Sequence, residues 1–341
     1  MEAAYTMSEE KYLLSIRDLK VDLMSVRGIV YALSGVNLDI RPGEIHGLVG
    51  ESGCGKSMTS KSILRLHNEQ RSRMSGQILF EGQDLLKISR RQMQAIRGNR
   101  ISMIFQDPMT SLNPLLTIGD QISESYRQHE KCTKAEAKAK TLELLEKVGI
   151  YPPEKRFSQY PFELSGGLQQ RVMIAMAIAC SPALLIADEP TTALDVTIQA
   201  QVLELLQKLS REMNMAILLI THNFGIVAEI CDCVSVMYAG RVVETSSTRD
   251  IFRRAAHPYS KALIDSIPKA GSESEYLSTI PGAPPQLFSE NPACAFRDRC
   301  PFADETCAKR PPERLIAPDH MAACHHILTD ENNNEVGGAD V

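Results

Sequence analysis

The segment Gly50–Ser57 (GESGCGKS) constrains the fold of this chain more than any other part of its sequence. It matches the pattern GxxxxGK[ST] at every fixed position. The apolar run 45–49 before it and the predicted helix 56–67 after it supply the strand–loop–helix context that this pattern requires. Glycines let successive backbone N–H groups turn towards one phosphate, and the helix adds the positive end of its dipole. We therefore predict a nucleoside-triphosphate site.

Each residue type of this loop has a chemical reason to be there. Lys56 is expected to reach the β- and γ-phosphates, and Ser57 to bind Mg²⁺ through its hydroxyl. The other residues of the loop are expected to bind ATP with it: Gly50, Glu51, Ser52, Gly53, Cys54 and Gly55. Chance alone would produce the pattern in about one chain in a hundred of this length, so other motifs must support it.

The rest of the chain predicts an α/β fold. Residues 183–187 and 216–220 are uninterrupted apolar runs, as in parallel strands that are buried on both faces. Strands that alternate with helices indicate a doubly wound P-loop NTPase core. Within 117–149, apolar side chains recur at helical spacing among many charged ones, so we predict a helical subdomain over about residues 100–178.

Two carboxylates follow the first of these apolar runs. Asp188, at the end of the predicted strand, is expected to hold Mg²⁺, and Glu189 to act as the general base for the attacking water. Without the phosphate loop, an ordinary acidic turn after a strand would be the better interpretation.

The octet Leu164–Arg171 (LSGGLQQR) resembles the signature motif of ATP-binding-cassette (ABC) ATPases. A serine and two glycines open a predicted helix over 168–179, which makes a second anion site from helix-end amides. The resemblance implies that Ser165, Gly166 and Gly167 bind the ATP of a partner subunit. A serine–glycine helix cap alone would not account for the complete octet.

Other motifs follow in the order that the family has. By resemblance, Gln106 is the Q-loop glutamine that contacts Mg²⁺, Asp195 belongs to the D-loop that crosses to the partner, and His222 is the switch histidine that contacts the γ-phosphate. A lone glutamine or histidine is more often structural, and it is their spacing from Asp188 and Glu189 that favours these catalytic roles. The aromatic residue that stacks on adenine is harder to assign, and Tyr31 is the best candidate.

The resemblance covers about residues 11–327 and narrows to the ATPase subunits of oligopeptide, dipeptide and nickel importers. Asn223 departs from this subfamily, which usually has Asp after the switch histidine. The resemblance implies ATP hydrolysis coupled to the uptake of peptides, with nickel or a metal chelate as the alternative cargo. These stretches carry it: Phe105–Pro114 (FQDPMTSLNP), Asp188–Thr197 (DEPTTALDVT), His257–Tyr259 (HPY) with Lys261–Leu263, and Ile280–Pro285 (IPGAPP).

The family also implies partners. They are a second ABC ATPase subunit, expected to be a different homologous chain, two transmembrane permease subunits and an extracytoplasmic substrate-binding protein. We expect the chain to be peripheral at the cytoplasmic face of the cell (inner) membrane. It shows no secretory signal, and its most apolar stretch, 172–187, is shorter than the roughly 20 residues of a membrane helix. The net charge of −5 argues against a nucleic-acid partner.

Two other classes of function fit less well. ABC ATPases of DNA repair or translation typically carry a long coiled-coil insertion or two cassettes with a basic surface, and this sequence has neither. A non-enzymatic cassette would have lost catalytic residues, which are all present: Lys56, Asp188, Glu189 and His222.

Four of the nine cysteines lie in one C-terminal stretch: Cys294, Cys300, Cys307 and Cys324. Disulfides are disfavoured in a reducing cytosol, and structural zinc sites usually pair cysteines two to four residues apart, which these do not. An iron–sulfur cluster tolerates wider spacing and needs four thiolates. The resemblance to peptide-importer ATPases implies a 4Fe–4S cluster, with zinc and free thiols as alternatives. The adjoining His325 and His326 are rival ligands.

We expect three parts along the chain. An ABC ATPase nucleotide-binding domain should span 11–254, and a C-terminal extension of the peptide-importer type, which contains the four cysteines, should span 255–328. The stretch 329–341 is acidic and rich in Asn and Gly, and we expect it to be disordered.

Overall fold

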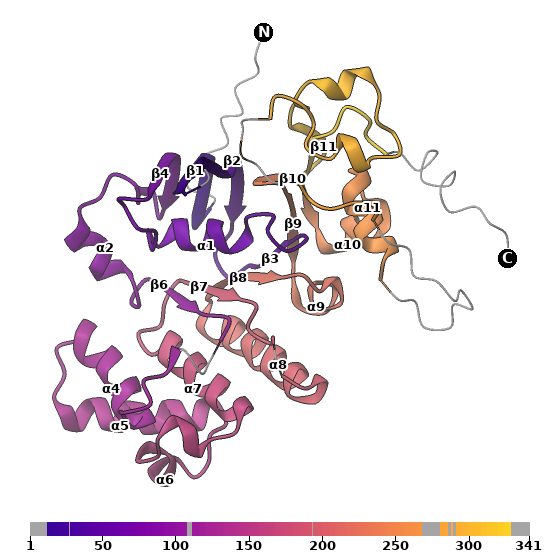
Figure 1. The fold of residues 1–341 in the computed structure, drawn as a ribbon. Helices are drawn as coiled ribbons and strands as arrows, with labels where there is room; N and C mark the ends of the chain where they lie inside the picture. Colours follow the sequence, from indigo (N-terminus) through magenta and orange to yellow (C-terminus); the bar gives the residue numbers. More distant parts are fainter. Residues whose placement is uncertain are drawn as a thin grey trace, which may run out of the picture. The chain divides into compact units, whose positions relative to one another are not determined.

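The computed structural model describes residues 12–26, 28–107, 111–192, 194–267, 280–285, 288 and 291–328 (Figure 1). The expected disordered tail over 329–341, residues 108–110 of the Q-loop stretch and Ala193 of the D-loop stretch lie outside the described residues. The chain divides into two compact units. Unit 1 takes in the described residues of 1–40, 46–86 and 221–341, and unit 2 those of 41–45 and 87–220.

Unit 1 contains a four-stranded antiparallel sheet with the strand order β2-β1-β4-β5. Along β1, the side chains of Leu14 and Ile16 are fully buried, and past a bulge Leu19 and Val21 are buried in their place. The extra residue of the bulge moves the apolar positions from even to odd numbers, and one face of the sheet stays apolar. The strands are β1 (Leu14–Ser25), β2 (Gly28–Ile40), β4 (Ser72–Phe80) and β5 (Gln83–Asp84).

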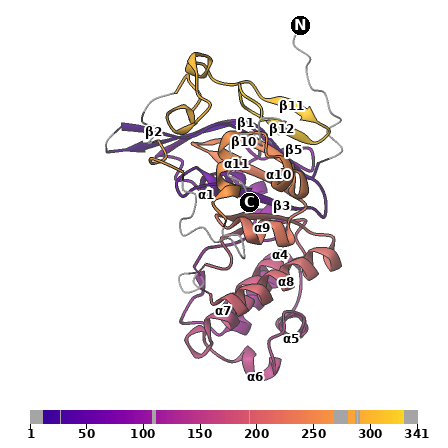
Figure 2. The same ribbon diagram turned by 90° about the vertical axis from the view of Figure 1, so that its right-hand side faces the viewer.

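A second group of strands in unit 1 has the order β11-β12-β10-β9-β3 and is mixed. β3 pairs in parallel with β9, whereas the pairs from β9 to β11 are antiparallel. Figure 2 shows the β11–β12 hairpin beside β10. The strands are β3 (Ile45–Val49), β9 (Cys233–Tyr238), β10 (Arg241–Ser247), β11 (Arg314–Ala317) and β12 (His320–Ala322). The helices are α1 (Lys56–Ile63), α9 (Phe224–Ile230), α10 (Thr248–Arg254), α11 (Pro258–Asp265), η3 (Arg297–Arg299) and η4 (Glu305–Ala308).

A buried carboxylate joins three elements of unit 1. Glu244 of β10 has no exposed surface and accepts hydrogen bonds from the backbone N–H groups of Ala256 (2.7 Å) and His257 (2.9 Å). Nε2 of His320 on β12 lies 2.8 Å from the same side chain. These partners satisfy a charge that burial alone would make costly. Glu244 thereby ties the start of α11 and the strand β12 to β10.

Unit 2 contains three parallel strands in the order β8-β7-β6, and every residue of β7 and β8 is buried. Within this unit α4 packs on α5, α6 and α7 (Figure 1). The strands are β6 (Ile101–Ile104), β7 (Leu184–Asp188) and β8 (Ala216–Thr221). The helices are α2 (Arg90–Ile96), α4 (Ile118–His129), α5 (Lys134–Lys147), α6 (Pro153–Phe157), η2 (Pro161–Glu163), α7 (Gly166–Ile178) and α8 (Val196–Met213). Among the described residues, none of the helices combines the length and apolar character that crossing a bilayer needs.

Candidate nucleotide-binding site

The predicted phosphate loop joins β3 to α1 in unit 1, as the strand–loop–helix pattern requires. Gly50 has a φ of 150°, and a Cβ added to it would lie 2.1 Å from the carbonyl oxygen of Met237. No larger residue fits there without moving β9. Gly55, with a φ of 110°, is the N-cap of α1. The backbone amides of the loop therefore lie next to the positive N-terminal end of that helix. This is the geometry of an anion site.

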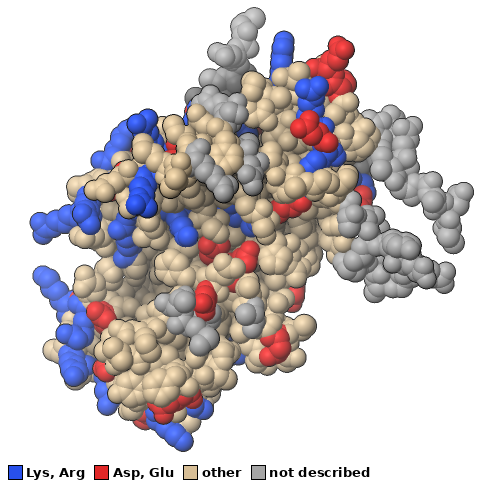
Figure 3. All heavy atoms as spheres, viewed as in Figure 1, with Lys and Arg blue, Asp and Glu red and all other residues tan. Residues whose placement is uncertain are grey.

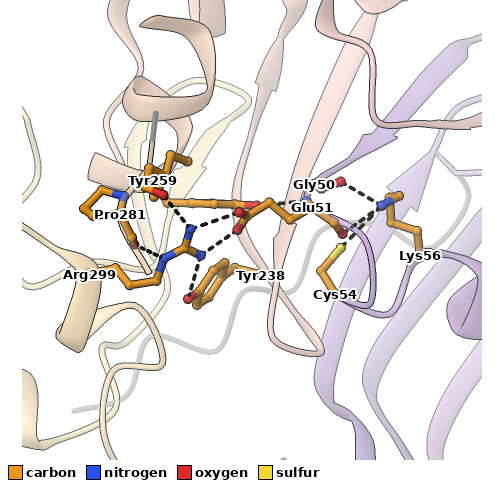
Figure 4. Close-up of polar contacts among 9 residues, drawn as sticks. Gly50, Glu51, Cys54, Lys56, Tyr238, Tyr259, Pro281 and Arg299 are labelled. Carbon is orange, nitrogen blue, oxygen red and sulfur yellow. Dashed lines mark hydrogen bonds and ion pairs between the residues drawn. The ribbon is translucent and has the colours of Figure 1, made fainter. Parts of the chain in front are cut away.

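Lys56 lies against the loop that it follows in the sequence. Its Nζ donates to the carbonyl oxygens of Gly50 (2.7 Å) and Glu51 (3.0 Å), and the residue is only 6% exposed (Figure 4). Nζ also lies 3.7 Å from Sγ of Cys54. Burial raises the pKa of the Cys54 thiol, although the charge of Lys56 opposes part of this effect. Cys54 is therefore a protonated thiol and not a nucleophile.

Glu51 is anchored by two residues that lie far along the chain from it. Its backbone N–H donates to the hydroxyl of Tyr259 (3.0 Å), and its carboxylate accepts two hydrogen bonds from Arg299, of 2.7 and 2.9 Å (Figure 4). Tyr259 lies in the HPY stretch that the sequence singled out. Arg299 stands among charged residues beside Cys300, and no local signal marks it.

In unit 2, Asp188 and Glu189 lie at the carboxyl end of the buried strand β7. Asp188 is 5% exposed. Glu189 has a φ of 48°, a left-handed conformation that is uncommon for a glutamate, and its N–H donates to the carbonyl of Ile220 (2.9 Å). Non-glycine residues in such conformations concentrate at functional sites, where the surrounding structure maintains them.

The carboxylate of Glu189 meets the predicted Q-loop glutamine. Gln106 follows β6 after Phe105, and its Nε2 donates to Oε2 of Glu189 at 2.9 Å. Thr192, which lies in the stretch Asp188–Thr197 named above, donates through Oγ1 to the same oxygen at 3.1 Å. The structure thus brings together two predicted catalytic residues of unit 2.

The residues expected to face a partner's nucleotide also lie close together in unit 2. Ser165 is the N-cap of α7, and its side chain makes no capping hydrogen bond. Asp195 caps α8 by accepting from the N–H of Ile198 (3.0 Å). A Cβ added to Gly167 would lie 2.9 Å from Ile198, so the glycine lets the start of α7 approach the start of α8.

His222 and Tyr31 belong to unit 1. His222 is exposed between β8 and α9. Asn223 is the N-cap of α9, where its Oδ1 accepts from the N–H of Gly225 (2.8 Å). An amide oxygen caps a helix as a carboxylate oxygen does, so Asn in place of the family's Asp preserves this turn. Tyr31 lies in β2 next to Ala32. The backbone of Ala32 is close to the phosphate loop, since a Cβ added to Gly55 would lie 3.2 Å from the carbonyl oxygen of Ala32.

The four C-terminal cysteines converge in unit 1. The N–H of Cys294 donates to the carbonyl of Cys307 (3.0 Å). Burial, and after it the negative charge of neighbouring thiols, raises the pKa of Cys294 and Cys300, and raises that of Cys324 to about 12. None of the nine cysteines, all of which the structure describes, is in a disulfide. Four cysteine thiolates are the ligand set of an iron–sulfur cluster, so the residue types present fit such a group.

The two histidines beside Cys324 differ in their surroundings. His325 has Nε2 at 3.0 Å from the carbonyl oxygen of Lys309, which engages that nitrogen with the backbone. His326, Cys307 and Asp304 bring their ligand atoms within 4.8 Å of one another, and this trio is a rival metal-binding set.

The sequence is similar to proteins of known families. Residues 33–192 match the family "ABC transporter", and residues 243–307 match "oligopeptide/dipeptide transporter, C-terminal region". A probable peptide ABC transporter ATP-binding protein of Sinorhizobium fredii is 52% identical over 92% of this chain and 94% of its own. The dipeptide transport ATP-binding protein DppD of Bacillus subtilis is 47% identical over 91% and 93%. The oligopeptide transport ATP-binding protein OppD of Salmonella typhimurium is 46% identical over 92% and 93%.

Solved structures share the fold. The ATP-binding cassette MJ0796, in a dimeric post-hydrolysis state bound to ADP and Pi, superposes with a TM-score of 0.62 at 27% identity, over 69% of this chain and 99% of its own. The structure of cbiO1 from Clostridium perfringens gives a TM-score of 0.61 at 28% identity, over 72% and 92%. The α/β fold of an ABC ATPase, expected from the sequence, is therefore confirmed.

Proposed function

The chain belongs to the ATP-binding-cassette transporter family, and we propose that it is the ATP-hydrolysing subunit of an importer of di- and oligopeptides. The observation that carries the ATPase function is the phosphate loop of unit 1, where a glycine-capped helix and the buried Lys56 form an anion site. The peptide cargo is supported by the relatives, which are named as peptide, dipeptide and oligopeptide transport proteins, and by the match of residues 243–307.

We propose the following roles for the site residues. Lys56 and the loop amides bind the phosphates of ATP, and Tyr31 stacks on the adenine. Ser57, Gln106 and Asp188 hold Mg²⁺, which would supply the positive charge that the transferred phosphate needs. Glu189 takes a proton from the attacking water, and its hydrogen bond from Gln106 orients its carboxylate. His222 contacts the γ-phosphate, and Ser165, Gly166, Gly167 and Asp195 contact the ATP of a partner subunit.

The proposed partners are a second, different ABC ATPase subunit, two permease subunits and a substrate-binding protein. The proposed location is the cytoplasmic face of the inner membrane. A hollow of about 600 Å³ in unit 2 supports permease docking, since the apolar side chains of Leu116 and Phe157 line it. Its charged lining residues are three basic ones and two acidic ones: Arg127, Lys134, Lys138, Asp120 and Glu124. Gln121 of α4 holds the end of the Q-loop stretch next to this hollow, through hydrogen bonds with the backbone of Asn113 (2.9 and 3.0 Å). Figure 3 shows basic side chains on the side of the unit where α4 and α5 lie.

The four cysteines are proposed to hold a 4Fe–4S cluster. Four thiols close together along the sequence in unit 1 support this, because a 4Fe–4S cluster is held by four cysteine thiolates. The cluster would also crosslink short segments that contain little secondary structure. We further propose the domain limits expected above: a cassette over 11–254 with its helical subdomain at about 100–178, an extension over 255–328, and a tail over 329–341.

Two assays test the function. The purified full chain should bind MgATP, and the Lys56→Ala chain should not bind it at the same concentration. In cells that lack the chromosomal gene, the parental chain should restore uptake of labelled di- and oligopeptides, and the Lys56→Ala chain should not. If the parental chain restored uptake of labelled nickel and not of peptides, the cargo would be a metal and the proposed peptide cargo would be wrong.

A further inference from the structure

Arg299 in the cysteine-bearing segment holds the first variable residue of the phosphate loop. It stands one position before Cys300, in the short helix η3. Its two terminal nitrogens donate to the two carboxylate oxygens of Glu51 at 2.7 and 2.9 Å (Figure 4). The side chain of Arg299 is 6% exposed and that of Glu51 is 25% exposed. A two-pronged pair with this little solvent contact has both a defined geometry and little screening.

The guanidinium of Arg299 is itself held on several sides. Its Nε donates to the carbonyl of Pro281 (2.8 Å), and one terminal nitrogen lies 3.3 Å from the hydroxyl of Tyr238. It also lies over the rings of Tyr238 and Phe296, at 5.8 and 6.0 Å from their centroids. Because these contacts leave the guanidinium little freedom, its position determines the position of the Glu51 carboxylate.

The backbone of Glu51 is fixed as well. Its N–H donates to the hydroxyl of Tyr259 (3.0 Å), and its carbonyl accepts from Nζ of Lys56 (3.0 Å). Burial raises the pKa of Tyr259, so its hydroxyl stays neutral and can accept this hydrogen bond. The side chain and the N–H of Glu51 are thus both held by residues that follow position 255. The carbonyl of the same residue contacts the lysine that is expected to bind the phosphates.

We propose that Arg299 is a positioning residue for ATP binding, because it holds Glu51 and so keeps the phosphate loop in the conformation that accepts nucleotide. Through Arg299 the cysteine-bearing segment braces the nucleotide site. Nothing in this role requires Arg299 to touch the nucleotide. The inference rests on the proposed ATP-binding function.

Two explanations of the Arg299–Glu51 pair predict opposite changes in ATP affinity for a substitution of Glu51: an effect of charge alone and an effect of anchoring the loop. ATP is an anion, so Glu51→Gln, which removes a negative charge beside the loop, would strengthen binding if only charge mattered. If Glu51 acts by anchoring the loop, the same variant binds ATP more weakly. Arg299→Ala weakens binding under both explanations and does not distinguish them.

The experiment is calorimetric titration of MgATP into the full chain and its variants. We expect Arg299→Ala and Glu51→Gln each to raise the Kd about tenfold, the change that 1.4 kcal/mol produces, and the double variant to raise it no further. Arg299→Lys keeps the positive charge but loses the two-pronged hydrogen bonding of the guanidinium, so its Kd should lie between that of Arg299→Ala and that of the parental chain. Arg297→Ala removes an exposed arginine from the same short helix and should leave the Kd unchanged.

A role in stability alone would lower the melting temperature without changing the Kd of the folded chain, so both are measured. If Arg299→Ala fails to fold, Glu51→Gln and Arg299→Lys still carry the test. Unchanged affinity in the folded variants, tighter binding by Glu51→Gln, or additive effects in the double variant would each overturn the proposal. The parental Kd tests the proposed function separately. A parental chain that binds no nucleotide would refute that function, whereas a parental chain that binds MgATP no better than the folded variants would refute only the role of Arg299.

Discussion

Gln106 donates a hydrogen bond of 2.9 Å from its Nε2 to Oε2 of Glu189, across a separation of 83 residues in the sequence. Thr192, three residues after Glu189 in the sequence, donates from its Oγ1 to the same oxygen at 3.1 Å. A carboxylate with two donors on one oxygen has a defined orientation, which a general base needs. The glutamine expected to contact Mg²⁺ is therefore in direct contact with the residue expected to activate water.

The first prediction concerns this carboxylate. Glu189→Gln should lower the ATP turnover of the assembled transporter about a hundredfold or more, because an amide cannot take the proton from water. The Kd for MgATP should change by less than about threefold, which is within about 0.7 kcal/mol. Glu204→Gln, on the exposed face of α8, is the matched control and should hydrolyse ATP normally. Turnover of Glu189→Gln at the parental rate would refute the assignment of the base.

The second prediction concerns Lys56. Replacing it with alanine removes a charged donor that is 6% exposed, and should raise the Kd for MgATP about 10- to 100-fold, as expected for a lost charged hydrogen bond. Lys61→Ala removes an exposed lysine from the same helix and should bind MgATP like the parental chain. Calorimetry of both variants measures the difference. Equal affinities would mean that Lys56 does not contact the phosphates.

The third prediction concerns the converging thiols. The chain purified without oxygen should contain about four irons with matching sulfide and absorb broadly near about 400 nm. Cys300→Ser should lose this absorbance and most of the iron, whereas Cys180→Ser, in the other unit, should keep both. A colourless chain with about one zinc would point instead to a zinc-stapled extension, with Asp304, Cys307 and His326 as candidate ligands.

The fourth prediction concerns the dependence of stability on pH. Burial lowers the pKa of His257 from 6.5 to about 4, although the charge of Glu244 opposes part of this shift. Between these values the unfolded chain binds a proton that the folded chain does not. The free energy of unfolding should therefore fall as the pH is lowered from about 6.5 to 4, by up to about 3 kcal/mol, and this contribution is fully present above pH 6.5.

Denaturant titrations across this pH range measure the effect. His257→Asn should have a shallower pH dependence, because asparagine does not titrate and its oxygen can still accept the hydrogen bond that His257 receives from the N–H of Tyr259 (3.0 Å). If the variant loses stability with the same slope as the parental chain, other groups cause the acid sensitivity.

Local sequence patterns predicted the functional residues wherever these are neighbours in the sequence. The phosphate loop could be predicted because its glycines, lysine and serine act through a short stretch of backbone. Asp188 and Glu189 could be predicted because they end an apolar run. The predicted helix 56–67 was too long, since α1 ends at Ile63. Arg65 takes a left-handed φ of 48°, and the N–H of Leu66 returns to the carbonyl of Lys61 (2.9 Å). This ending usually has glycine, so the sequence did not reveal it.

The sequence by itself determined the family, the fold class and the stretches that would bind phosphate, because these depend on local backbone geometry and on the spacing of apolar residues. Only the tertiary structure decided which distant residues meet. It brought Gln106 to Glu189, Cys294 to Cys307, and Arg299 to Glu51. These pairs depend on how strands and loops pack, and a contact between two residues that are not neighbours in the sequence leaves no periodicity or motif in the chain. For that reason no local pattern marked Arg299, although its side chain is buried against the phosphate loop.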